Sequence, residues 1–130
     1  MTLLEDIVEY LTGLGLIEGD GVDTYRDFKP ELPDNVVSLH EYKGDPVSAY
    51  TDVVHRSVQV SVRNKNAVAA KALADKLFGA FSTEDETKRI DFTSTRWGQV
   101  HIRQYPYKLS QDESDRVTYG FNLGITTTSD

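Results

Sequence analysis

RVTYGFNLGITT, residues 116–127, alternates apolar and polar side chains over almost its whole length. One set of positions is apolar: Val117, Tyr119, Phe121, Leu123 and Ile125. The set between them is small or polar: Thr118, Gly120, Asn122, Gly124 and Thr126. Because successive side chains of a strand point to opposite faces of a sheet, the stretch predicts a strand with one face in the core and one in solvent.

Residues 51–64 repeat this alternation and predict a central strand of the same sheet. Val58, Val60 and Val62 share one face with Arg56, which is therefore expected near one end of the strand. Residues 22–28 and 36–42 predict two shorter neighbouring strands, joined by a loop that contains two prolines. Residues 89–95 and 99–105 predict a β-hairpin.

Two helices are predicted, one at the start of the chain and one in the middle. Thr2 and Glu5 form a capping box before an apolar face that repeats at helical spacing as far as residue 14. Asn66 can cap a helix over residues 67–78, whose alanines allow close packing on a sheet. The chain is thus expected to be one α+β domain, residues 1–130. Its mixed, mostly antiparallel sheet carries two flanking helices, in the order α-β-β-β-α-β-β-β.

Composition excludes several functional classes. The 130 residues include no cysteine, so disulfides, thiolate metal sites and thiol nucleophiles are excluded. A net charge of -7 disfavours binding to the phosphate backbone of nucleic acid. Apolar runs are too short for a membrane span, and a soluble protein of the reducing cytosol is expected.

Residues with catalytic or metal-binding chemistry are present but lack the spacing that such chemistry needs. His40, His55 and His101 lie singly in predicted strands, which favours polar positions on the solvated sheet face. The serines include no Gly-x-Ser-x-Gly elbow, and the acidic runs do not match a calcium loop. We therefore predict no enzyme, and no catalytic, cofactor-binding or metal-binding residues.

Surface features offer better candidates for function. Arg96 and Trp97 fall at the predicted hairpin tip, where a large aromatic residue can anchor an interface. Two acidic loops interrupt the strands, and their carboxylates are Glu84, Asp85, Glu86, Asp112, Glu113 and Asp115. Arg96 and Trp97 are predicted as contact residues of an interface, and the acidic loops are expected in solvent.

The layout as a whole resembles the minor capsid and tail-terminator proteins of long-tailed bacteriophages, which join the tail to the head. The resemblance rests on the opening residues 3–11, the strand of residues 56–63, the alanine-rich helix after it, the segment 103–106 and the closing strand 116–127. It implies a virion protein made in the host cytoplasm that forms a homo-oligomeric ring, with a hexamer favoured. The ring would cap the tail tube, stop its elongation and offer a surface to the head.

The same resemblance implies the tail-tube protein and a head-completion or neck protein as partners, with DNA passing through the ring without specific binding. If one or both acidic loops, residues 84–86 and 112–115, border this channel or its rim, their carboxylates would repel the DNA phosphates over about 8 Å at physiological ionic strength. Two alternatives stay open: another neck protein, such as a head-closure subunit, or a monomeric module that binds a small molecule or peptide. The module would use Trp97, His101 and Tyr119 as polar handles in a pocket between sheet and helix.

Overall fold

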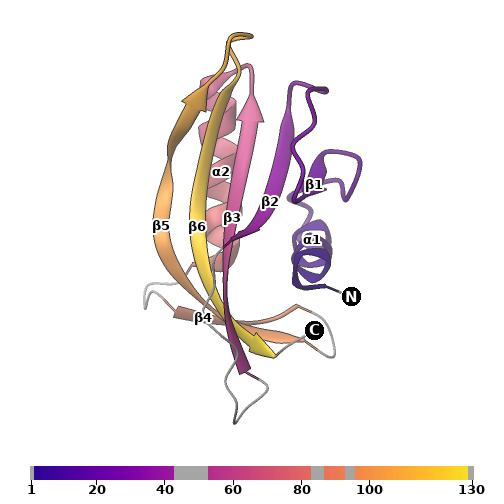
Figure 1. The fold of residues 1–130 in the computed structure, drawn as a ribbon, viewed down its shortest axis with the longest axis vertical. Coiled ribbons are helices and arrows are strands. Elements are labelled where there is room, and N and C mark those ends of the chain that lie inside the picture. The colour runs from indigo at the N-terminus through magenta and orange to yellow at the C-terminus, as the bar shows by residue number, and fades with distance from the viewer. Residues whose placement is uncertain (1, 43–52, 83–86, 93–95, 129–130) are drawn as a thin grey trace.

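A computed structural model describes residues 2–42, 53–82, 87–92 and 96–128 and shows an α+β domain (Figure 1). Its elements are α1 (Leu3–Gly13), β1 (Thr24–Arg26), β2 (Val36–Tyr42), β3 (Val53–Asn64), α2 (Ala67–Phe81), β4 (Thr87–Asp91), β5 (Trp97–Gln111) and β6 (Val117–Thr128). The predicted order α-β-β-β-α-β-β-β is therefore confirmed.

The six strands form one mixed sheet in the order β1-β2-β3-β6-β5-β4. The β1–β2 pair is parallel, and the other four neighbouring pairs are antiparallel. β3 and β6 lie in the middle and pair over their full lengths, from Val53 opposite Thr128 to Asn64 opposite Val117. The two strands with the clearest alternation in the sequence thus form the centre of the sheet.

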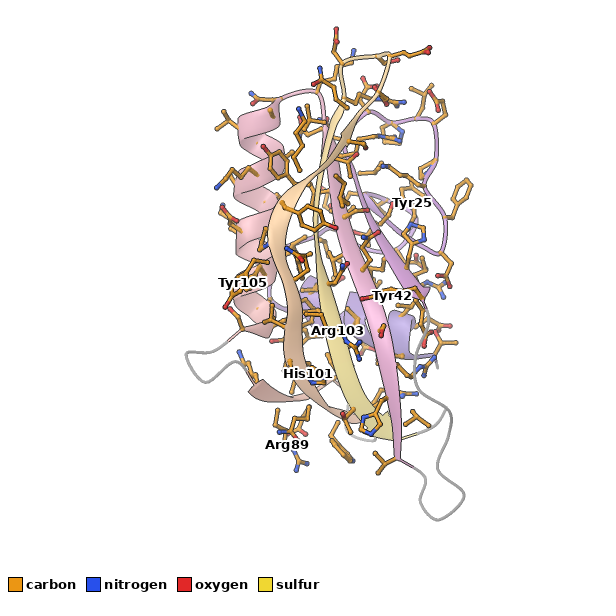
Figure 2. All side chains as sticks on the ribbon, turned by 60° about the vertical axis from the view of Figure 1, so that its left-hand side comes forward. Tyr25, Tyr42, Arg89, His101, Arg103 and Tyr105 are labelled. Carbon is orange, nitrogen blue, oxygen red and sulfur yellow. The ribbon has the colours of Figure 1, made fainter. Side chains whose placement is uncertain are left out.

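The core lies between the sheet and both helices. Val58, Val60, Phe121 and Leu123 are fully buried on the face that α1 and α2 cover. The helices meet at Tyr10, whose hydroxyl donates a hydrogen bond of 2.8 Å to the carbonyl of Ala80. Within the described residues, the opposite face of the sheet carries no helix (Figures 1 and 2).

The predicted boundaries were wrong at two elements in the first two thirds of the chain. The first strand spans three residues instead of seven, because turns flank it: the Asp23 carboxylate accepts hydrogen bonds from the amides of Glu18 and Gly19, and Asp27 has a φ of 51°. α2 continues past Gly79 to Phe81. The burial of the Phe81 ring against Phe121 favours the extra turn.

The predicted hairpin exists as β4 and β5, but its tip was placed wrongly. Trp97 belongs to β5 and lies opposite Asp91, so the connection runs through residues 92–96. β5 also continues past Pro106 to Gln111, beyond the predicted end at residue 105. Its pairing with β6 has three irregularities, and the one between Gln104 and Tyr107 contains the proline, which lacks a donor for a regular ladder. Arg56 lies near the start of β3, as predicted, and its guanidinium donates to the carboxylate of Glu41 at 2.7 Å.

Candidate functional site

Arg96 is buried, so its predicted place on an exposed hairpin tip was wrong. Its guanidinium forms an ion pair with the carboxylate of Asp6 on α1, and 7% of Arg96 and 3% of Asp6 remain exposed. The contact joins the first helix to the start of β5, ninety residues later in the chain. Arg96 therefore acts in folding rather than as a surface contact of the isolated domain.

Trp97, the next residue, is half-buried and remains a candidate contact residue. The guanidinium of Arg89 on β4 lies 5.4 Å from the centroid of its ring, a cation–π geometry. Arg89 is exposed (Figure 2) and also pairs with the carboxylate of Asp91 at 3.5 Å. This end of the sheet thus presents an aromatic ring beside an exposed ion pair.

The second acidic loop, residues 112–115, is the turn between β5 and β6 at the end of the sheet farthest from β4 (Figure 1). Burial raises the pKa of Asp112, but hydrogen bonds from the Arg116 amide and guanidinium and from the Ser114 amide outweigh that effect and lower it. Asp112 thus stabilises the turn, whereas Glu113 and Asp115 are exposed. The first acidic loop, with Glu84, Asp85 and Glu86, lies outside the described residues.

Two buried arginines, Arg63 of β3 and Arg116 beside β6, hold the loop of residues 27–35 against the end of the sheet. The Arg63 guanidinium donates to the carbonyls of Pro30, Glu31, Pro33 and Asp34 at 2.7 to 3.2 Å. That of Arg116 donates to the Glu31 carboxylate at 2.9 Å. Sequence reasoning missed this role of Arg63, because its partners lie about thirty residues earlier in the chain.

The three histidines lie on the sheet face that carries no helix. Strand register places His40 beside Gln59, His55 beside Thr126 and His101 beside Gly124. His101 lies with Arg103 over Gly124 (Figure 2), and burial, then the charges of Arg103 and His55, lower its pKa. Among the described residues no group of three His, Asp or Glu side chains could hold a metal ion.

Two of the three residues proposed to line a small-molecule pocket, His101 and Tyr119, do not lie together. Tyr119 packs against the core on the helix side of the sheet, whereas His101 lies on the other side. A pocket between β2, β3 and Leu73 of α2 has a volume of about 130 Å³. That is well below the roughly 300 to 1,000 Å³ typical of ligand sites. This pocket is therefore too small for a ligand of the usual size.

Comparison with protein families shows to which family the chain belongs. A family model described as bacteriophage tail terminator protein matches residues 10–129, which is nearly the whole domain. The chain belongs to the phage tail terminator family. A comparison with curated proteins finds no match.

This tail terminator is a structural protein of the phage tail and therefore a virion component. The match contains the entire sheet and α2 and begins in the last turns of α1. Within the described residues, no helix is long and apolar enough to cross a membrane.

We expect Arg96→Met to destabilise the fold. The substitution leaves the buried carboxylate of Asp6 without its ion pair, which should lower the free energy of unfolding by about 3 kcal/mol. Urea denaturation measures the loss, and Arg89→Met at an exposed position of β4 is the control. Adding Asp6→Leu to Arg96→Met should restore part of the stability, because no buried charge then remains. Unchanged stability in Arg96→Met would contradict a structural role.

Asp112 should make stability depend on pH in the acid range. Its lowered pKa means that the ionised carboxylate stabilises the folded state above the ordinary value of 3.8, and that this contribution is lost as the pH falls below it. Asp112→Asn should therefore lower the melting temperature at pH 7 and have progressively less effect below about pH 4. Glu113→Gln, one residue along, is the control. An equal effect of Asp112→Asn at pH 7 and pH 2 would rule out the proposed contacts.

Proposed function

We propose that this tail terminator caps the phage tail tube, stops its elongation and forms the surface to which the head is joined, as a hexameric ring. The observation that carries the proposal is the family match over residues 10–129. The tail-tube protein would lie on one side of the ring and a head-completion or neck protein on the other. Its mechanism is geometric, because a ring that fits the tube on one face only prevents the addition of further tube subunits.

The shape of the domain supports two different ring faces. β5 spans the length of the sheet, with Trp97 at one end and the 112–115 turn at the other (Figure 1). At about 3.3 Å per residue, its fifteen residues separate these ends by up to roughly 50 Å. Head-to-tail copies around an axis all point the same way, so the end with Trp97 and the end with the 112–115 turn would form opposite faces.

The acidic residues fit a channel through which DNA passes without specific binding. We propose that Glu84, Asp85 and Glu86 in one loop and Asp112, Glu113 and Asp115 in the other border the channel or its rim. The net charge of -7 supports this, because fixed negative charge repels phosphates within about 8 Å. The protein would be made in the host cytoplasm and incorporated into the virion there.

The capping proposal predicts rings at tube ends. Short tubes grown from the tail-tube protein of the same phage, mixed with this protein, should stop growing and show a terminal ring in negative stain. Light scattering should give a mass of about six times 14.6 kDa for the ring, free or released from tubes. Binding to the neck but never to tube ends would indicate a head-closure protein instead. A monomer that binds neither the neck nor the tube ends would favour the alternative, a module that binds a small molecule or peptide.

Trp97 should contribute to assembly more than to folding. The Trp97 side chain is half-buried at the end of the sheet. Trp97→Ala should therefore lower tube capping at least tenfold, while the melting temperature changes by only a few degrees. Capping is counted in negative stain, and melting is followed by circular dichroism. Loss of the folded state in Trp97→Ala would instead make Trp97 a core residue.

A further inference from the structure

Charge differs between two parts of the domain: α1 and β1 lie at one edge of the sheet, whereas α2 lies over β3, β5 and β6 and β4 forms the other edge (Figure 1). Residues 2–28, which form α1 and β1, contain seven carboxylates and one basic side chain. Residues 67–111, which include α2, β4 and β5, contain seven basic side chains and five carboxylates, of which Glu84, Asp85 and Glu86 lie outside the described residues. Asp6 and Arg96 neutralise each other in the interior. The first part then keeps six carboxylates and Arg26, and the described second part keeps six basic side chains, Asp75 and Asp91.

The acidic side is defined by the carboxylates Glu5, Glu9, Glu18, Asp20, Asp23 and Asp27. Apolar side chains are exposed among them: Val22 at 57% and Phe28 at 59%. The Phe28 ring contacts Tyr25 of β1 edge to face, with the ring centroids 6.2 Å apart. This side therefore combines negative charge with aromatic surface of the kind that anchors interfaces.

The basic side is defined by Lys71, Lys76, Lys88, Arg89, Arg103 and Lys108. It also exposes aromatic surface, with Tyr105 at 61% (Figure 2) and Tyr107 at 38%. Tyr105 is fixed by its contact with Phe78 of α2, with the ring centroids 5.3 Å apart. β4 covers β5 only as far as His101, and no other described strand pairs with that edge beyond it, which leaves backbone groups available to a partner.

We propose that the acidic side of one copy docks on the basic side of the next, and that this is the contact that builds the ring. The inference rests on the proposed function and adds the surfaces that make the contact. One chain carries both halves of a complementary pair on different parts of the domain, which is the arrangement that a head-to-tail interface needs. A two-fold interface that used either side alone would bring like charges together.

Charge reversal tests the proposal. One variant carries Glu9→Lys and Glu18→Lys on the acidic side, and a second carries Lys76→Glu and Lys108→Glu on the basic side, all at exposed positions. Each variant alone should associate, or cap tubes, at least tenfold more weakly than the parent protein. An equal mixture should recover association, because the intact acidic side of the second variant can dock on the intact basic side of the first. Circular dichroism confirms that both variants are folded.

The outcomes separate this inference from the proposed function. If the parent caps tubes and both variants cap them equally well, the charged sides are not the contact, whereas capping itself stands. If both folded variants fail and their mixture also fails, the pairing of these two sides is wrong. If the parent neither associates nor caps, the proposed function fails and the interface with it.

Cross-linking gives a second test that does not depend on charge. The chain has no cysteine, so Phe28→Cys and Tyr105→Cys each introduce one thiol. With a bismaleimide long enough to span a protein interface, the mixture of the two variants should yield cross-linked dimers. Each variant alone should yield at least tenfold less. Efficient cross-linking of either variant with itself would overturn the head-to-tail contact.

Discussion

The antiparallel pairing of β3 with β6 is the constraint on which the rest of the structure depends. Twelve residues of each strand are in unbroken register, and a shift by one residue would move every apolar side chain to the other face. The register gathers Val58, Val60, Phe121 and Leu123 on one face, where both helices pack. The opposite face is consequently polar and small, and its central strand has glycine at positions 120 and 124.

Those glycines show how the uncovered face is used. A Cβ atom at Gly120 would lie 2.7 Å from a side-chain carbon of Leu109 and 2.8 Å from the carbonyl oxygen of Val60. At Gly124 it would meet the side chains of His101 and Arg103. Side chains of β5 thus lie over the glycines of β6, so β5 partly covers the face of the sheet on which no described helix packs.

Much of the fold was predictable because alternation and helical periodicity report burial directly. The central strands, both helices and the element order followed from such patterns, and Thr2 and Asn66 cap the helices as predicted. The roles of Arg96 and Arg63 were not predictable, because each depends on a partner far away in the sequence, on α1 or in the 27–35 loop. The difference in charge between the two parts of the domain was likewise hidden, since net charge says nothing about where strand order places each segment.

The contacts of Arg63 and Arg116 also determine which side chains of the loop of residues 27–35 are held in place. Arg63 reaches four main-chain carbonyls in this loop, and Arg116 also bonds the carbonyl of Glu31. Every amino acid supplies a carbonyl, so these contacts do not fix the side chains of the loop, apart from Glu31, whose carboxylate pairs with Arg116. An exposed side chain of the loop such as Leu32 can therefore be exchanged while the contacts that hold the backbone are kept.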